Sequence, residues 1–269
     1  MKIISNKIKI TQLIHNKKSL GFVPTMGGIH LGHISLIKRS IRECANTVVS
    51  IFINKQQFNK ESDFITYPRT LNKDISKIRK LKVNVLYLPT VKEIYPNGYN
   101  KKIKIDSFGK KLCGKFRPRH FEAVADVIDR FIKIIKPNKI YFGQKDMQQL
   151  KIMEDFIIKN HPSCKVVACK TIRELNGIAC SSRNEFLSKT QKIIASKVIK
   201  LLMREKRNLI YNKISVDNFK KILHKLGVSD IDYIDILDVN KLIKPYKKKN
   251  KYKVFIAYHL GMTRLIDNI

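Results

Sequence analysis

Residues 21–33 read GFVPTMGGIHLGH and contain the features that decide the fold. An apolar run with β-branched residues ends at Pro24, as expected for a buried strand. Gly27 and Gly28 then allow a tight turn, and apolar residues at helical spacing predict a helix that begins near His33. A strand that leads through a glycine turn into a helix is the start of a βα unit, and its turn lies where such units bind ligands.

The alternation of strands and helices continues through the first half of the chain. Short apolar runs rich in β-branched residues predict strands at 20–24, 48–53, 83–88, 139–142 and 165–169. Between them, residues 33–45 and 123–135 place their apolar side chains on one helical face. This order predicts an α/β fold for residues 1–171, a Rossmann-like domain whose parallel sheet is covered on both faces.

The pattern changes after about Thr171, where we expect a smaller α+β domain over residues 172–269. Residues 188–191 form a capping-box pattern, which indicates a helix start. The elements expected in this domain are helices at 188–203 and 216–226 and strands at 231–239 and 253–258, with a basic turn at 244–251 between the strands.

The net charge is the most unusual property of the composition. The 269 residues include 55 Lys and Arg but only 21 Asp and Glu, which gives a net charge of +34. Such an excess favours anionic ligands and is typical of proteins that bind nucleic-acid phosphates. The lysines are, however, spread along the whole chain together with many Ile and Asn, and these three residue types share A/T-rich codons. A biased genome is therefore our preferred explanation, and nucleic acid is not an expected partner.

The cysteines and the hydropathy pattern bear on the compartment. The five cysteines are an odd number without a C-x-x-C pair, which argues against a disulfide framework and for a reducing compartment. No apolar run approaches the ~20 residues of a membrane helix, and the N-terminal residues lack the apolar core of a signal peptide. We therefore expect a cytoplasmic protein that does not span a membrane.

Two histidines follow the glycine turn after the strand predicted at 20–24. His30 and His33 are three residues apart, so both side chains can face one spot at the helix start. Imidazoles there would stabilise charge that builds on an attacked phosphate, and helix N–H groups favour an anion at the same place. The alternative is an ordinary strand–turn–helix corner with two surface histidines, but the glycine turn favours a functional site.

Amide and charged side chains follow two other strands. Asn54, Gln56 and Gln57 suit the recognition of hydroxyl and carboxylate groups, although taken alone they are more typical of a polar loop. Lys145 and Asp146 suit phosphate and ribose oxygens respectively. A helix N-terminus with Asp146 placed favourably for the helix dipole is an equally good and compatible interpretation.

Two further segments carry clustered donors. The Ser-Ser-Arg sequence at 181–183 suits a triphosphate, but residues 182–185 read S-x-x-E, and alone a capping box is the better interpretation. Arg117, Arg119 and His120 precede a predicted helix. They either add positive potential over an anion site or form a solvated basic turn, and we favour the turn.

Taken together, these segments resemble the pantothenate synthetase family. The motifs that carry the resemblance are VPTMGGIHLGH, SIFIN..QF, YPRTL, LCG…RP.HF, YFG.KD.QQL and SSRN, in this order over roughly residues 20–190. The H-x-G-H signature alone is shared with other nucleotidyltransferases and with class I aminoacyl-tRNA synthetases. The resemblance implies ATP-dependent joining of (R)-pantoate to β-alanine through a pantoyl adenylate, with release of AMP and pyrophosphate, by a homodimer that uses Mg²⁺.

The resemblance also implies roles for single residues, with the domain at 172–269 closing over ATP. It assigns catalytic roles to His33, His30, Lys145 and Arg183. It assigns ATP binding to Met26, Gly27, Gly28, Ile29, His30, Leu31, Gly32, His33, Gly143, Gln144, Lys145, Asp146, Ile172, Cys180, Ser181, Ser182 and Arg183. Gln57 and Gln149 are implied for pantoate, Gln57 also for β-alanine, and Asp74 is a candidate Mg²⁺ ligand.

Four positions depart from the family pattern, and none removes a group that the chemistry needs. Leu31 and Gln144 each stand in place of a glutamate, and Cys180 stands in place of a methionine. Lys55 replaces a proline, so the loop before Gln57 is expected to be less rigid.

Three other functions compete with this interpretation. Another adenylate- or cytidylate-forming nucleotidyltransferase would share the nucleotide site, but the two glutamines favour pantoate over a phosphorylated acceptor. A nucleic-acid-binding protein would explain the charge but leaves the strand-end motifs unexplained. An inactive copy of the enzyme is disfavoured because His30, His33, Lys145, Asp146 and residues 181–183 are intact.

Overall fold

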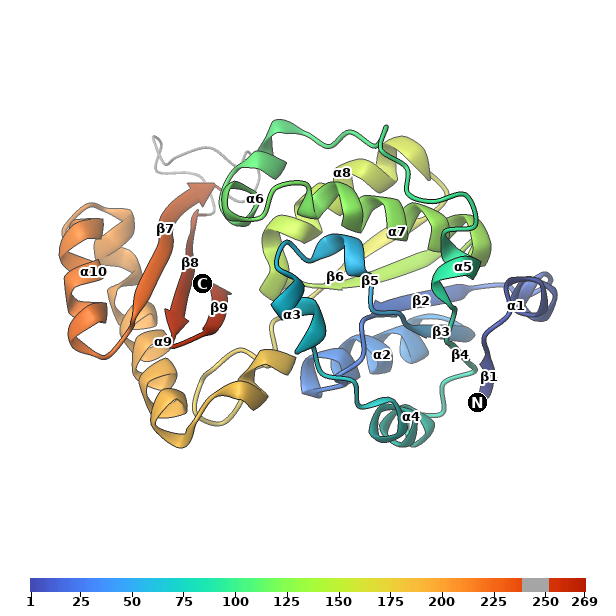
Figure 1. Ribbon diagram of the computed structural model, residues 1–269, viewed down its shortest axis with the longest axis horizontal. Helices are drawn as coiled ribbons and strands as arrows, with labels where there is room; N and C mark the ends of the chain where they lie inside the picture. Colours follow the sequence, from blue (N-terminus) through green and yellow to red (C-terminus); the bar gives the residue numbers. More distant parts are fainter. Residues whose placement is uncertain (239–251) are drawn as a thin grey trace. The chain divides into compact units, whose positions relative to one another are not determined.

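The computed structural model describes residues 1–238 and 252–269. The chain divides into two compact units, Met1–Lys170 and Thr171–Ile269, and Figure 1 follows the chain through both. The basic turn expected at 244–251 and the end of the strand expected at 231–239 lie outside the described residues.

The first unit is built on a parallel sheet, as the sequence predicts. Within the described residues it has six strands in the order β1-β4-β3-β2-β5-β6, and every neighbouring pair is parallel. The strands are β1 (Lys2–Ile4), β2 (Leu20–Thr25), β3 (Asn46–Ile51), β4 (Val85–Tyr87), β5 (Lys139–Gly143) and β6 (Lys165–Cys169). From β2 the order runs through β3 and β4 on one side, with β1 added at the edge, and through β5 and β6 on the other. The switch point where such sheets bind ligands therefore lies between β2 and β5.

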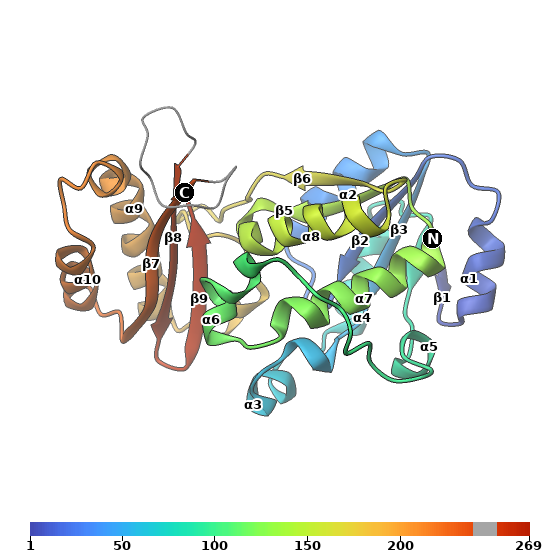
Figure 2. The same ribbon diagram turned by 90° about the horizontal axis from the view of Figure 1, so that it is seen from above.

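Helices cover both faces of this sheet. Alternate residues of a strand point to opposite faces: Gly21 of β2 lies against Ser40 of α2 (Leu31–Glu43), whereas Phe22 packs on Phe131 of α7 (His120–Ile135). Figure 1 shows α2 on one side of the sheet and α7 on the other, and in Figure 2 α7 and α8 run side by side. The remaining helices of the unit are α1 (Lys7–Ile14), α3 (Glu61–Ile65), α4 (Leu71–Arg79), α5 (Val91–Ile94), α6 (Cys113–Phe116) and α8 (Met147–Asn160), with single 3₁₀ turns η1 (Lys55–Gln57), η2 (Ser107–Lys110) and η3 (Gln144–Asp146).

The second unit is the expected α+β arrangement. Two helices, α9 (Lys189–Ile210) and α10 (Val216–Lys225), accompany an antiparallel sheet that within the described residues has the order β7-β8-β9. The predicted capping box is confirmed, because Ser188 and Gln191 exchange hydrogen bonds at the start of α9. The strands are β7 (Asp230–Asp238), β8 (Tyr252–Leu260) and β9 (Thr263–Asn268), and the unit also contains the 3₁₀ turn η4 (Ser182–Phe186).

A bulge in β7 changes which side chains reach the core. The register between β7 and β8 shifts between Ile231 and Tyr233, which leaves Asp232 as the extra residue. Ile231 and Ile234, three positions apart, therefore both pack against the apolar core, where a regular strand would require an even spacing. The bulge leaves Asp232 near Asp230 and His259.

Candidate active site

Three of the predicted motifs follow neighbouring strands and meet at one edge of the parallel sheet. The glycine turn follows β2, the Gln57 segment follows β3, and the Lys145 segment follows β5, and β2 lies between β3 and β5. Gln57 Nε2 lies 2.9 Å from Met26 Sδ, so the first two motifs are in contact. The sheet order thus brings together residues that are more than 100 positions apart in the chain.

The glycine turn is held by a buried carboxylate. Gly27 and Gly28 have φ of 84° and 60°, conformations that a side chain disfavours. Asp74, only 1% exposed, accepts hydrogen bonds from Gly28 N at 2.9 Å, from Ile29 N at 2.8 Å and from Thr70 Oγ1 at 3.1 Å. Both carboxylate oxygens of Asp74 are therefore already used to fix the turn, which leaves little capacity for a direct metal bond.

His30 caps the helix that follows the turn. Its Nδ1 accepts a hydrogen bond from Gly32 N at 3.1 Å, so α2 begins at Leu31, earlier than the predicted start near His33. An accepting Nδ1 leaves the ring hydrogen of neutral His30 on Nε2. The rings of His30 and His33 stack with centroids 4.0 Å apart, which confirms that the two imidazoles share one spot.

Both imidazoles are neutral at physiological pH. The pKa of His30 is lowered to about 3. Burial is the largest cause, and electrostatic repulsion from His33 and Lys145 lowers the pKa further. Burial likewise lowers the pKa of His33 to about 4, with Lys145 and then Lys77 as further causes, partly offset by a backbone hydrogen bond at Gly28. The Nδ1 atom of His33 is buried and has no hydrogen-bond partner among the described residues.

Lys77 is a functional candidate that the sequence analysis missed. Its ammonium donates a 2.5 Å hydrogen bond to Ile29 O, and its charge contributes to the low pKa of both histidines. The signal that could have found it was its spacing from Asp74, because residues three apart share one face of α4. Together Asp74 and Lys77 hold the two sides of the glycine turn.

The segment after β5 presents a lysine and an exposed acid. Lys145 Nζ lies 3.4 Å from Asp146 Oδ1, and Asp146 has 48% of its side chain exposed. Of the two glutamines that follow, Gln148 is buried and binds main-chain groups of the 108–113 loop, whereas Gln149 is only half-buried. Gln149 is therefore the better placed of the pair to meet a ligand.

The predicted ATP-binding residues of the second unit form a compact hairpin and turn. Cys180 N donates to Ile172 O at 2.9 Å across the hairpin. The capping box predicted at residues 182–185 is wrong, because Ser181 is the cap of η4 and accepts from Arg183 N at 3.3 Å. Arg183 Nη1 donates to Arg264 O at 3.1 Å, which ties this turn to β9.

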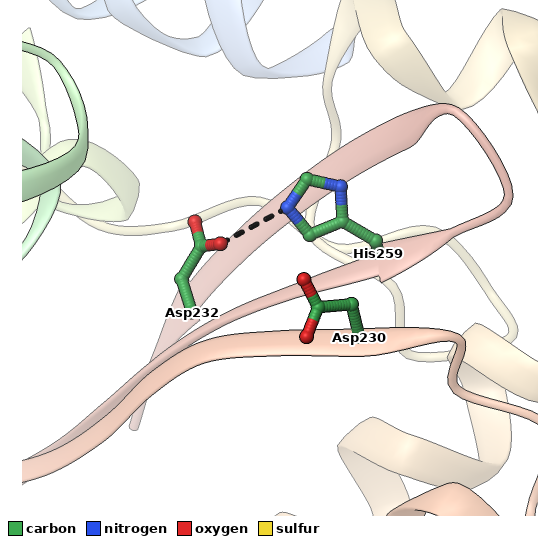
Figure 3. A group of neighbouring side chains, drawn as sticks. All are labelled: Asp230, Asp232 and His259. Atoms are coloured by element: carbon green, nitrogen blue, oxygen red, sulfur yellow. Dashed lines mark hydrogen bonds and ion pairs between the residues drawn. The ribbon is translucent and has the colours of Figure 1, made fainter.

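Figure 3 shows a group in the second unit with the residue types of a metal site. One potential ligand atom from each of Asp230, Asp232 and His259 lies within 4.8 Å of the others. Asp232 Oδ1 lies 3.1 Å from His259 Nε2, and Arg264 Nε donates to the other oxygen at 2.6 Å. A cation here would stand beside the fixed charge of Arg264, so the arrangement is better described as an ion-pair network around the bulge.

Comparisons with known proteins show which family the chain resembles. A family model described as pantoate-beta-alanine ligase matches residues 2–269. A pantothenate synthetase from Sulfurihydrogenibium sp. (strain YO3AOP1) is 39% identical over 280 residues, which is 100% of this chain and 99% of that relative. A solved pantoate-beta-alanine ligase from Thermus thermophilus superposes with a TM-score of 0.90 at 31% identity over 100% of this chain and 99% of that chain.

A second solved relative was crystallised with ligands. The pantoate-beta-alanine ligase from Francisella tularensis, complexed with beta-gamma ATP and beta-alanine, has a TM-score of 0.87 and 33% identity, covering 100% of this chain and 97% of that chain. Among the described residues, no helix is long and apolar enough to cross a membrane. Since the family model, the sequence of a relative and the fold of a solved structure agree over essentially the whole chain, the protein belongs to the pantoate–beta-alanine ligase family, the pantothenate synthetases.

Proposed function

We propose that the protein condenses (R)-pantoate with β-alanine at the expense of ATP, through a pantoyl adenylate, and releases AMP and pyrophosphate. Membership of a ligase family over the whole chain supports this activity. The observation that carries it at the site is the pair of stacked, neutral imidazoles at the glycine turn, whose pKa values are lowered in part by the charge of Lys145.

The glycine turn and Lys145 form the triphosphate subsite in this proposal. The turn and the N-terminus of α2 favour phosphate, with Met26, Gly27, Gly28, Ile29, His30, Leu31, Gly32 and His33 as the residues of the binding segment. Lys145 and Asp146, with Gly143 and Gln144, are assigned to the phosphates and ribose from the other side of the switch point. Incoming phosphate charge raises the pKa of both histidines, so they donate hydrogen bonds most strongly when charge builds on the α-phosphate.

Two glutamines hold the acid in this proposal. The pantoate carboxylate attacks the α-phosphorus, and pyrophosphate leaves with its charge stabilised by Lys145 and the imidazoles. Gln57 and Gln149 hold the hydroxyl and carboxylate groups of pantoate in line for this attack, because amides offer both donors and acceptors. The amine of β-alanine then attacks the acyl carbon, with Gln57 as a contact for this substrate too, and AMP leaves. The β-alanine bound by the Francisella relative supports the second substrate.

The family resemblance assigns further ATP contacts to residues of the second unit. Ile172 would lie beside adenine, and Cys180, Ser181, Ser182 and Arg183 would close over the triphosphate. The hydrogen bond that fixes Arg183 to β9 supports a role as a pre-positioned cation. Replacement of Arg183 by alanine should therefore weaken ATP binding or slow adenylate formation without affecting the Gln57 subsite.

Mg²⁺ accompanies ATP in this proposal and neutralises phosphate charge. Asp74 does not fit as a direct ligand, because its two oxygens already accept three hydrogen bonds in a buried position. We therefore assign the ion to the phosphate oxygens of ATP and Asp74 to the turn. A cytoplasmic location, a homodimer and the absence of a nucleic-acid partner complete the proposal and rest on the family resemblance and on the spread of the charge.

The direct test is product analysis with the purified protein. Incubated with ATP, Mg²⁺, pantoate and β-alanine, it should form pantothenate and AMP in equal amounts, as measured by mass spectrometry. Omission of pantoate should abolish both products. Formation of ADP, or a reaction that proceeds with a phosphorylated acceptor in place of pantoate, would contradict the proposal.

A further inference from the structure

The loop that carries Gln57 is fixed from outside by residues that precede α7. Gln57 ends the single 3₁₀ turn η1, in which Gln57 N bonds Asn54 O and Phe58 N bonds Lys55 O. The last carbonyls of so short a helix have no partner within it, and Gln57 O is one of them. A carbonyl of this kind must be satisfied by another part of the protein or by water.

Arg117 and His120 satisfy this carbonyl together. His120 Nδ1 lies 2.7 Å from Gln57 O, and Arg117 Nη2 donates to the same oxygen at 3.0 Å. A carbonyl only accepts, so Nδ1 of His120 carries the hydrogen, and its Nε2 faces Arg117 Nη1 at 3.4 Å. His120 is 6% exposed, which shields this arrangement from water.

Other contacts align the same two segments. Asn54 Nδ2 donates to Ala123 O at 3.2 Å, and Asn59 Nδ2 donates to Pro118 O at 2.7 Å. Arg119, between Arg117 and His120, adopts φ of 62°. A left-handed conformation in a residue other than glycine is uncommon and is retained where the surroundings require it. The chain is thus bent so that both donors converge on the end of η1.

We propose that Arg117 and His120 are positioning residues that act through the Gln57 main chain to aim its side chain at pantoate and β-alanine. The inference rests on the proposed function, which assigns both substrates to Gln57. Once its peptide is fixed, the Gln57 side chain needs only to keep its contacts with Asn54 Nδ2 at 3.4 Å and Met26 Sδ at 2.9 Å. Preorganisation of this kind lowers the entropy lost when substrate binds.

Two substitutions at one position isolate the donor. In His120→Asn the amide nitrogen can take the place of Nδ1 and donate to Gln57 O, whereas His120→Gln places its amide near the former Nε2. Both remove the ring and share the packing loss. We expect His120→Gln to raise KM for pantoate and β-alanine about tenfold, as for loss of one buried hydrogen bond, and His120→Asn to remain within about threefold of the unmodified protein. KM for ATP should change in neither.

A double substitution tests the route through Gln57. If His120 acts through this residue, His120→Gln should add nothing to the pantoate KM of Gln57→Ala, whereas independent effects would multiply. Arg117→Met should, like His120→Gln, raise KM for pantoate and β-alanine and leave KM for ATP unchanged. This variant keeps the test open should one His120 variant fail to fold. The inference would be overturned if His120→Asn and His120→Gln had equal KM values for pantoate, or if KM for ATP rose by a similar factor. It would also be overturned if the effects of His120→Gln and Gln57→Ala on the pantoate KM multiplied in the double variant. Absence of pantoate-dependent pyrophosphate release in the unmodified protein would instead overturn the proposed function itself.

Discussion

His30 and His33 show how the surroundings of a residue decide its chemistry. Two histidines on an exposed corner would titrate near the ordinary value, but burial next to Lys145 lowers the pKa of His30 to about 3 and of His33 to about 4. The neutral rings add no charge to a turn that must accept both the phosphates and an incoming carboxylate. They become better hydrogen-bond donors as negative charge arrives.

Removal of His33 should slow the first chemical step. We expect His33→Ala to reduce adenylate formation by on the order of 10²–10³, the effect of losing one donor aimed at developing charge. Pantoate-dependent pyrophosphate release in a single turnover measures this step. An unchanged rate in a folded variant would remove His33 from the mechanism.

The same residue should make the fold sensitive to acid. The unfolded chain binds a proton at His33 near pH 6.5, whereas the folded chain does so only near pH 4, so stability falls as the pH drops through this window and is unaffected above it. His33→Gln should flatten this fall by up to about 3 kcal/mol, as measured by urea unfolding between pH 7 and pH 4. His15→Gln, at an exposed histidine, is the control and should follow the unmodified protein. If the free energy of unfolding fell equally with pH in His33→Gln and in the unmodified protein, the low pKa assigned to His33 would be contradicted.

At the scale of elements, close packing of α2 on β2 places the glycine turn. A Cβ at Gly21 would lie 2.2 Å from Ser40 Oγ and 3.0 Å from Cys44 Sγ, so helix and strand approach more closely than a side chain permits. This contact fixes how closely α2, the helix that His30 caps, packs on the strand that leads into the glycine turn.

Substitution at Gly21 should therefore destabilise the fold. We expect Gly21→Ala to lower the free energy of unfolding by about 1–3 kcal/mol through overpacking. The added Ser40→Ala should recover part of this loss, because it removes the atom that the new Cβ meets. Gly143→Ala is the matched control, since a Cβ there meets nothing within 4 Å. Equal unfolding midpoints for Gly21→Ala and Gly143→Ala would show that the approach is looser than described.

The elements differ in how well the sequence predicts them. Strand β6 was predicted at its observed bounds, because a compact apolar run has polar neighbours at both ends. Strand β1 was missed because it is a three-residue edge strand whose side chains are largely exposed, and β9 was missed as well. The hydrogen bonds of Asp74 to the glycine turn were not predicted, because its partners Gly28 and Ile29 are more than 40 residues away and only the fold brings them into contact.

For the whole molecule, the order of the strands was the decisive feature that pattern alone could not supply. The sequence predicted that ligand-binding residues follow the strands, but it gave no pairing between β2 and β5. That pairing and the β2–β3 pairing bring His33, Lys145 and Gln57 to one edge. The resemblance to a family supplied their roles, and the proposed roles of Arg117 and His120 emerged only from their convergence on one carbonyl.

The charge of +34 should act on ATP in particular. Between about 50 and 500 mM KCl, we expect KM for ATP to rise several-fold, because salt shortens the range of the protein's positive potential from more than 10 Å to a few ångströms. KM for β-alanine, a substrate without net charge, should change much less. Similar changes in the two constants would mean that the excess charge has no part in attracting the nucleotide.

The central claim is that one site first activates pantoate and then transfers it. The most direct measurement follows pyrophosphate and AMP after mixing the protein with ATP, Mg²⁺ and pantoate, with β-alanine withheld and then added. The account predicts a pantoate-dependent burst of pyrophosphate, of about one equivalent per site, followed by steady release of AMP only after β-alanine is present. Absence of a pantoate-dependent burst in folded protein, or AMP release that does not require β-alanine, would contradict it.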